Sequence, residues 1–297
     1  MIIANRRSFL RFGSMAAISA TFTHGWCRTA PAPKTVAVGA QLYTLHKEVM
    51  EDLPGALAAL KKIGFQMVEG YSGMYTRPAR ELRAMIEDAG LTLPSSHFAY
   101  DTLDSQLDYA HDLGVSYMVC AMLPKPYQNR EGFAKAAATF NAVGAKAKSM
   151  NIKLGFHNHN FEFQPLPGPT DVAATDSSDI GLKILLDQTD PALVSWEEDC
   201  YWVAQGGLNP LTLLQKYSAR IPMLHLKDRT ADATTTYGPG KNSQFFTEIG
   251  TGTIDWSPIV RSAQGSGKLM FIEQDTTRMP AIESLAVSYK NLQKYLA

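Results

Sequence analysis

Cysteine is scarce in this sequence of 297 residues, which contains only Cys27, Cys120 and Cys200. A structural zinc site of the thiolate type needs several cysteine ligands placed close together in the fold. Three cysteines so far apart in the sequence do not supply them, so we do not expect such a site.

The chain also lacks an excess of either charge, with 28 basic residues against 28 acidic ones. Four of the bases and none of the acids fall in the first 32 residues, which leaves 24 bases against 28 acids in the rest. A mildly acidic body argues against the phosphate backbone of a nucleic acid as a partner.

Long hydrophobic runs are missing too. The moderately apolar stretch Phe12–Phe22 is too short and too rich in Ser and Thr to span a bilayer as a mature helix. It follows Arg6 and Arg7 and precedes Ala30-Pro31-Ala32-Pro33, an arrangement that resembles a twin-arginine export signal. A basic amphipathic first helix is the alternative. We therefore predict a signal peptide over residues 1–32, a folded domain over residues 33–297, and a periplasmic or secreted protein.

From Val36 onward, short β-rich apolar runs alternate with longer segments of helical spacing. The expected strands are Val36–Tyr43, Phe65–Glu69, Leu91–His97, Tyr117–Met122, Lys153–His159, Val194–Asp199, Met223–Lys227 and Leu269–Glu273. The expected helices include Pro54–Lys62, Ala79–Ala89, Leu103–Leu113, Gly132–Met150, Leu211–Ser218 and Ile282–Leu296. Eight repeats without a Pro/Ser-rich linker predict an α/β fold of the (β/α)8 TIM barrel type.

A doubly wound open sheet is the alternative fold. It should show a glycine-rich nucleotide-binding turn after the first strand, and Gly39–Tyr43 is no such turn. In a barrel, Cys120 and Cys200 lie on strands that are not neighbours, so we expect free, buried thiols. The segment from Asp228 to Thr253 shows no helical or strand period, and we interpret it as a flap after the seventh strand.

Polar, metal-capable residues close each of the last four strands. They are His157, His159 and Glu162 after strand five, Glu197 and Asp199 in strand six, His225 and Lys227 in strand seven, and Glu273 in strand eight. The carboxyl ends of barrel strands converge on one mouth, and residues two apart on a strand share a face. Carboxylates and imidazole at one point suit a divalent ion such as Mn²⁺, Mg²⁺, Co²⁺ or Zn²⁺. Each residue alone is more simply a polar rim group, whereas four successive strands favour a site.

Five stretches in this order are similar to the signatures of the xylose-isomerase-like barrel superfamily, in its sugar phosphate isomerase/epimerase branch. They are HNHNFEF (157–163), DPALVSWEEDCYWVAQGGLNP (190–210), RIPMLHLKD (220–228), EIGTGTIDW (248–256) and FIEQD (271–275). The resemblance implies a divalent ion held by Asp199, His225, Glu273 and one further group. Relatives place a glutamate where this chain has His157, so we predict Glu162 as the fourth ligand and leave His157 or His159 as the alternative.

The resemblance also implies proton abstraction next to a sugar carbonyl, with an enediolate stabilised by the ion. Glu162 and Glu273 are then the acid/base candidates, and we expect Lys227 to stabilise the oxyanion or a leaving group. We expect a small-molecule sugar or sugar derivative to contact His97, His157, His159, Glu69 and Trp202. Core packing for Trp202 and an ion pair for Glu69 are the simpler alternatives.

An isomerase or epimerase is the function we predict. A lyase or dehydratase acting on keto-sugars or keto-glycosides by the same chemistry is the main alternative, since export and the lack of a phosphate-binding glycine loop disfavour a sugar phosphate. A non-catalytic sugar-binding barrel and a nuclease similar to endonuclease IV are further alternatives. The sequence is compatible with a homo-oligomer but carries no signal for one.

Overall fold

The computed structural model describes residues 37–167, 179–238 and 243–296. The predicted signal peptide and Cys27 lie outside these ranges, so export stays a prediction. None of the helices in the described ranges is both long enough and apolar enough to cross a membrane.

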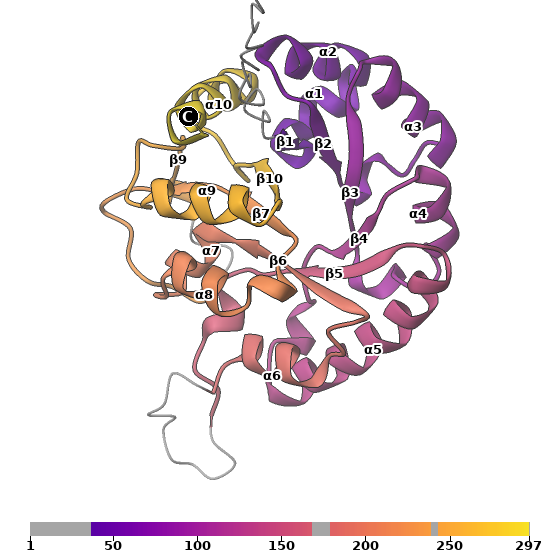
Figure 1. Ribbon diagram of the computed structural model, residues 1–297, viewed down its shortest axis with the longest axis vertical. Helices are drawn as coiled ribbons and strands as arrows, with labels where there is room; N and C mark the ends of the chain where they lie inside the picture. The colour runs from indigo at the N-terminus through magenta and orange to yellow at the C-terminus, as the bar shows by residue number, and fades with distance from the viewer. Residues whose placement is uncertain (1–36, 168–178, 239–242, 297) are drawn as a thin grey trace, which may run out of the picture. The chain divides into compact units, whose positions relative to one another are not determined.

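Eight parallel strands close into one barrel in the order β1-β10-β7-β6-β5-β4-β3-β2 (Figure 1). The strands are β1 (Val38–Gln41), β2 (Met67–Gly70), β3 (Thr92–Phe98), β4 (Tyr117–Cys120), β5 (Lys153–His157), β6 (Val194–Asp199), β7 (Met223–Leu226) and β10 (Leu269–Ile272). The predicted TIM barrel is confirmed, and the open sheet is wrong because β1 pairs with both β2 and β10.

Helices surround the strands (Figure 1). They are α1 (His46–Glu51), α2 (Leu53–Ile63), α3 (Ala79–Asp88), α4 (Leu107–Leu113), α5 (Arg130–Ser149), α6 (Gly181–Gln188), α7 (Cys200–Gln205), α8 (Pro210–Lys216), α9 (Trp256–Gly265) and α10 (Ala281–Leu296). Sequence reading missed α1, α6 and α7, which have only six to eight residues. Two turns are too short to show a period of 3.6 residues.

Local signals account for the ends of α2. The side chain of Asp52 accepts a hydrogen bond from the backbone N–H of Gly55 at 3.0 Å, and Pro54 lies in the first turn. At the other end Gly64 has a φ of 123°, a conformation that side chains disfavour. The buried Leu57 and Leu60 share one face of this helix.

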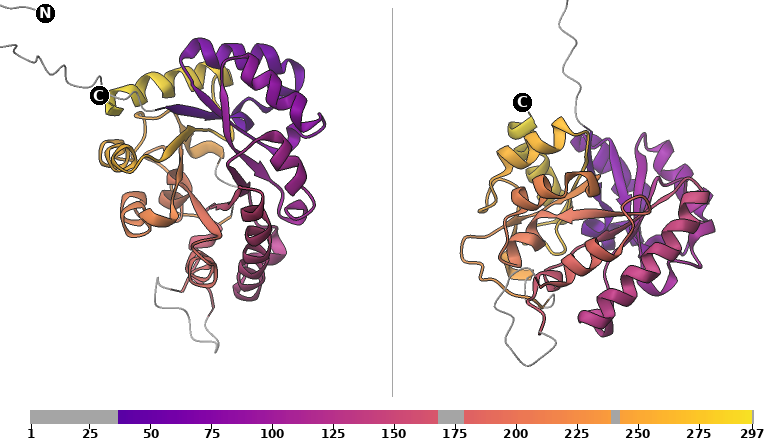
Figure 2. Two further views of the ribbon diagram at one scale, coloured as in Figure 1. Left: turned by 45° about the vertical axis from the view of Figure 1, so that its right-hand side comes forward. Right: turned by 60° about the horizontal axis from the view of Figure 1, so that its bottom comes forward.

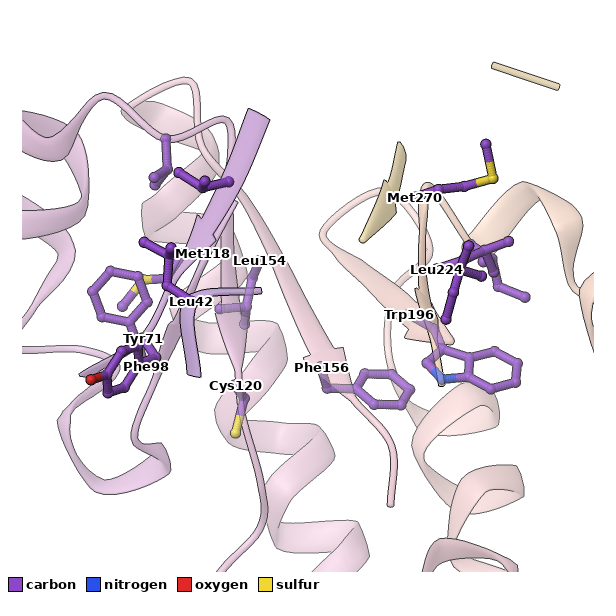
Figure 3. Close-up of a cluster of buried hydrophobic side chains, with 14 of the residues drawn as sticks. Leu42, Tyr71, Phe98, Met118, Cys120, Leu154, Phe156, Trp196, Leu224 and Met270 are labelled. Carbon is purple, nitrogen blue, oxygen red and sulfur yellow. The ribbon is translucent and has the colours of Figure 1, made fainter. Parts of the chain in front are cut away.

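The main core lies between the strands and the helices. Figure 3 shows side chains of successive strands in this layer, among them Cys120, Phe156 and Trp196. The rings of Phe156 and Trp196 stack with centroids 6.4 Å apart. Cys120 and Cys200 are both free and buried, as predicted.

A second, small cluster fills the barrel interior below the mouth. It consists of Met67, Val119, Met223 and Phe271. A side chain on Gly39 would collide with the ring of Phe271, so this position in β1 requires glycine. The polar groups at the carboxyl ends of the strands lie above this apolar plug.

The first and last parts of the barrel are joined by α10, which lies beside α2 (Figure 2). The hydroxyl of Tyr289 donates to the carbonyl of Gly64 at 2.8 Å. The ring of Tyr289 also packs on Phe65, with centroids 4.7 Å apart. These contacts close the ring of helices.

The segment after β7 has more order than its sequence pattern indicates. Two-residue strands, β8 (Asp228–Arg229) and β9 (Phe246–Thr247), pair antiparallel. The buried carboxylate of Asp228 accepts hydrogen bonds from the backbone N–H groups of Gly250 and Gly252 and from the indole of Trp256. The sequence shows no strand period here because two-residue strands are too short to show alternation, and the flap after strand seven stays an interpretation.

Candidate metal centre

Four residues predicted or considered as metal ligands meet at the barrel mouth. His157, Asp199, His225 and Glu273 each offer one ligand atom, and these atoms lie within 4.8 Å of one another. They come from the ends of β5, β6, β7 and β10, and all four are buried. We call them the mouth cluster. A buried set of two imidazoles and two carboxylates could hold a divalent ion.

Asp199 is held by the helix that follows it. Its Oδ1 accepts a hydrogen bond from the backbone N–H of Trp202 at 2.9 Å, which caps α7. Its Oδ2 is buried and accepts no hydrogen bond from the described residues, although Lys227 Nζ lies 3.0 Å away. Burial raises the pKa of Asp199 to about 6, against the opposing effect of the Lys227 charge.

The two ring nitrogens of His157 face two different carboxylates. Its Nδ1 lies 3.0 Å from Oε2 of Glu197, and its Nε2 lies 3.5 Å from Oδ2 of Asp199. Burial lowers the pKa of His157 to about 3, so the ring is neutral. Both nitrogens face carboxylates, and only Nδ1 forms a hydrogen bond with its carboxylate, so we place the ring proton on Nδ1. The lone pair of Nε2 then faces the unpartnered oxygen of Asp199, and a cation between them satisfies both.

His225 and Glu273 complete the mouth cluster, with Nδ1 of the imidazole 2.8 Å from Oε2 of the carboxylate. Burial opposes the charged form of His225, but Glu197, Glu69 and Glu273 together raise its pKa well above the ordinary value. For Glu273 burial is likewise outweighed, here by the charges of Lys227 and His225, and its pKa is well below the ordinary value.

Lys227 lies beside the mouth cluster, with its side chain 1% exposed. Its ammonium is 3.0 Å from Asp199, 2.5 Å from Glu273 and 2.6 Å from Asp275. It also lies over the ring of Trp202, 5.6 Å from the centroid. Burial alone would lower the pKa of Lys227, but the three carboxylates raise it well above the ordinary value.

A second set of groups, the inner cluster, lies one layer deeper. It consists of Glu69, His97 and Glu197, with the remaining ring nitrogens of His157 and His225. Glu197 precedes Asp199 by two residues on β6, which places both on the inner face, as predicted. The pKa of Glu197 would be raised by burial, but the charges of His225 and His97 hold it well below the ordinary value.

Glu162 lies outside both clusters. After β5 the chain turns into a short helix, Phe161–Phe163, and the carboxylate of Glu162 accepts a hydrogen bond from the backbone N–H of His159 at 3.0 Å. Burial raises the pKa of Glu162 to about 8. The predicted set of four ligands is therefore not assembled with Glu162, and His157, the alternative, occupies the fourth place.

A cavity of about 320 Å³ opens above the mouth cluster. It is lined by Tyr43, Tyr71, Ser72, His97, Ala121, Met122, His157, His159, Trp202, Lys227, Glu273 and Asp275. Four of the five predicted substrate contacts are in this lining. Glu69 is not, because it is fully buried in the inner cluster.

Glu197 was predicted to share the inner face of strand six with Asp199, but no specific role was predicted for it, nor for Asp275, Tyr43 or Tyr71. Alternation was a usable signal for the two acids, since each is two residues from a predicted ligand, Asp199 or Glu273. The tyrosines had no such signal, because Tyr43 and Tyr71 follow the first two strands and meet only in the fold, with ring centroids 5.5 Å apart.

Comparison with known proteins places this barrel in a family. The family model described as xylose isomerase-like TIM barrel matches residues 57–288, and the chain belongs to that family. Within it, an inosose dehydratase from Clostridium beijerinckii is 24% identical over 273 residues, covering 81% of this chain and 87% of that protein. An inosose dehydratase from Clostridium tetani is 29% identical over 184 residues, 58% of each chain.

Solved structures show the same fold. A sugar phosphate isomerase/epimerase from Parabacteroides distasonis has a TM-score of 0.72 at 25% identity, covering 89% of this chain and 96% of that chain. A probable 3-DHS dehydratase from Bacillus anthracis has a TM-score of 0.68 at 11% identity, over 86% and 98% of the two chains. This chain is thus a member of an enzyme family that acts on sugars and related small molecules, with dehydratases and isomerases among its relatives.

Proposed function

We propose that the protein is a divalent-metal-dependent enzyme that removes a proton next to the carbonyl of a keto-sugar or keto-cyclitol. One observation carries the proposal: the neutral His157 Nε2 faces Asp199 Oδ2 at 3.5 Å in a buried site, and Oδ2 accepts no hydrogen bond from the described residues, although Lys227 Nζ lies 3.0 Å from it. Lone pairs in that arrangement repel unless a cation lies between them. We assign His157, Asp199, His225 and Glu273 as the ligands of one ion, with Mn²⁺, Mg²⁺, Co²⁺ and Zn²⁺ as candidates.

Such an ion polarises a substrate carbonyl and so acidifies the neighbouring C–H bond. The residues of the chain supply the proton transfers. Glu273 lines the cavity, and because Lys227 and His225 hold its pKa low, its carboxylate is ionised and has a lone pair to accept the proton. Lys227 also lines the cavity, and its ammonium lies within 2.5 Å of Glu273. It is placed to stabilise a developing oxyanion or to protonate a leaving hydroxyl.

Loss of water from the substrate is the outcome we favour over isomerisation. Epimerisation through the predicted pair needs Glu162 and Glu273 on the same cavity, and Glu162 is not among the described residues that line it. One carboxylate base next to one ammonium acid suits an elimination. The names of the inosose dehydratase relatives support the same choice.

Isomerisation or epimerisation is the second candidate, and one observation favours it. Asp275 lines the cavity, and its side chain is 26% exposed. A second carboxylate could return the proton at another carbon or on the other face. The Parabacteroides distasonis sugar phosphate isomerase/epimerase supports this reading by its name.

The charges at the cavity favour an uncharged substrate. Asp199, Glu273 and Asp275 carry three negative charges, which the ammonium of Lys227 and one divalent ion balance. The described lining includes no arginine. A phosphate group would add unbalanced negative charge, so we propose a substrate without phosphate.

Two groups in the cavity wall are ready for substrate hydroxyls. Nδ1 of His159 and Nε1 of Trp202 are buried, and neither has a hydrogen-bond partner among the described residues. Both side chains line the cavity. A buried polar atom without a partner costs about 1–3 kcal/mol, which a hydroxylated ligand would relieve.

Metal analysis of the purified protein tests the site, followed by NMR in deuterated water on a panel of keto-cyclitols and keto-sugars. Loss of a hydroxyl group together with C–H exchange supports a dehydratase. Exchange with a new stereocentre or a moved carbonyl supports an isomerase or epimerase. A protein that binds panel sugars but exchanges no proton with any candidate metal would be a binding barrel, and tight binding of abasic DNA at physiological salt would point to a nuclease.

A further inference from the structure

The two acids of the inner cluster lie beneath the cavity floor rather than in its wall, whereas His97 lines the cavity. Of its acids, Glu69 and Glu197 are fully buried and are not among the described residues that line the cavity. A substrate in the cavity therefore does not reach them. Both acids contact imidazoles.

His157 and His225 contact both clusters. Each of these imidazoles directs one ring nitrogen to the mouth cluster and the other to the inner cluster. His157 directs Nδ1 to Glu197 at 3.0 Å and Nε2 to Asp199 at 3.5 Å. His225 directs Nε2 to Glu69 at 2.5 Å and Nδ1 to Glu273 at 2.8 Å. The inner acids thus contact the nitrogens that face away from the mouth cluster.

The inner acids are themselves held in place. Glu69 accepts a hydrogen bond from the amide of Gln41 at 2.8 Å and one from the hydroxyl of Ser95. Glu197 Oε2 lies 2.7 Å from Nε2 of His97, whose ring stacks on that of His225 with centroids 5.2 Å apart and planes 7° apart. The acceptor oxygens are therefore fixed by groups from β1, β3 and β7.

We propose that Glu197 and Glu69 are positioning residues that hold the N–H groups of His157 and His225 on the inner side, so that His157 Nε2 and His225 Nδ1 face the ion. The inference rests on the metal site proposed above and adds the residues that prepare it. Histidine ligands commonly donate their second N–H to a carboxylate, which fixes tautomer and ring orientation. For His157, whose ring is neutral, a tautomer set in advance removes the cost of moving a buried proton when the ion binds.

The structure offers a matched control beside Glu197. Glu198 is equally buried, follows directly on β6 and faces the opposite side of the strand, and its carboxylate oxygens have no hydrogen-bond partner among the described residues. Glu197→Leu and Glu198→Leu therefore remove the same side chain from adjacent buried positions. Only the first removes an acceptor from His157, and it also removes an ionised carboxylate, since burial raises the pKa of Glu198 well above the ordinary value.

Protein labelled with ¹⁵N-histidine gives the decisive readout, because long-range ¹H–¹⁵N correlation separates the two imidazole tautomers. We expect the metal-free wild type to carry His157 as the Nδ1–H form and the zinc-loaded protein to keep Nε2–H on His225. E197Q, whose amide oxygen can still accept, should retain the His157 tautomer, whereas E197L should populate the Nε2–H form. Wild-type His157 in the Nε2–H form would overturn the proposal, and this measurement needs no variant to fold.

Affinity for Co²⁺, followed by visible absorption in competition with a chelator, is the second readout. We expect E197L to bind Co²⁺ about 10- to 100-fold more weakly than the wild type and E198L to bind it within about threefold. Equal affinities in E197L and E198L would contradict the proposal. Two ions per chain, one of them lost in E197L, would show that the inner cluster is a second cation site.

Failure of the metal site itself is recognisable in the same experiment. A wild-type protein that binds no Co²⁺ or Zn²⁺ contradicts the proposed function, while the tautomer of metal-free His157 still reports on Glu197. Circular dichroism and thermal unfolding establish that each variant is folded before it is compared.

Discussion

Replacing Glu162 by glutamine should make the protein less sensitive to alkaline pH. The carboxyl group is 1% exposed, and burial raises its pKa from an ordinary value of 4.5 to about 8, against the effect of hydrogen bonds from the backbone N–H groups of Glu162 and His159. The folded state therefore binds this proton more tightly than the unfolded state does. Stability then falls as the pH rises from the unfolded pKa to the folded one.

The size of the effect follows from the two pKa values. The unfavourable contribution of Glu162 is about 1 kcal/mol at pH 5 and about 4 kcal/mol at pH 8. Glutamine keeps an acceptor for the His159 N–H and cannot ionise. The free energy of unfolding of the wild type should thus drop by about 3 kcal/mol more than that of E162Q between these pH values.

Urea unfolding followed by circular dichroism at half-unit steps from pH 5 to pH 8 measures the difference. The exposed carboxylate of Glu51 provides a control, since E51Q also removes one negative charge. Wild-type and E162Q curves that run parallel over this range would refute the reasoning.

The same variant distinguishes the two ligand assignments. With His157 as the fourth ligand, E162Q keeps the metal content of the wild type and H157N loses it. Loss of metal in E162Q with metal retained in H157N would restore the assignment predicted from the sequence.

Three further predictions concern other parts of the chain. K227M should lower kcat by about 100-fold or more, because it removes a proton donor and a cation from the cavity wall. Steady-state kinetics on a panel substrate that the wild type converts measures this change. An unchanged kcat would show that Lys227 takes no part in the reaction. D228N should lower the free energy of unfolding by about 3 kcal/mol or more. Both carboxylate oxygens of Asp228 accept hydrogen bonds from backbone N–H groups, so the NH₂ group of an asparagine would face such a donor in either orientation. A melting curve equal to that of the wild type would contradict this prediction. Replacing Arg6 and Arg7 together by lysine should leave the protein in the cytoplasm, which fractionation and N-terminal sequencing test; processing as in the wild type would exclude a twin-arginine signal.

The residues at the strand ends could be predicted because two local sequence patterns, an apolar run and the alternation of side chains, locate them. The apolar runs that end in Asp199, His225 and Glu273 locate three strands of the barrel, and alternation puts these side chains on its inner face. Asp199 illustrates how firmly the local signal holds, since β6 begins and ends at the predicted residues, Val194 and Asp199. The missed helices span only about two turns and the missed strands only two residues, so each contains too few repeats of its period for the pattern to predict it.

The position of the Glu162 side chain could not be predicted from local sequence patterns. The sequence indicates a carboxylate close to the end of strand five, and a bulge would have carried it into the mouth. Instead the chain turns at once into the helix Phe161–Phe163, whose phenylalanines are buried in the core, and Glu162 folds back onto the N–H of His159. Packing of the two rings, which no spacing rule reports, decides where the carboxylate goes.

By itself the sequence determined the barrel, the inner face of each late strand and the chemical type of the site. Only the tertiary structure decided which imidazole nitrogen meets which carboxylate and which acid lies beneath the cavity rather than in its wall. These depend on the register between neighbouring strands, as in the pairing of His157 with Glu197 and of Asp199 with His225. Register is a property of closed, packed strands, because it is fixed by contacts between residues far apart in the chain.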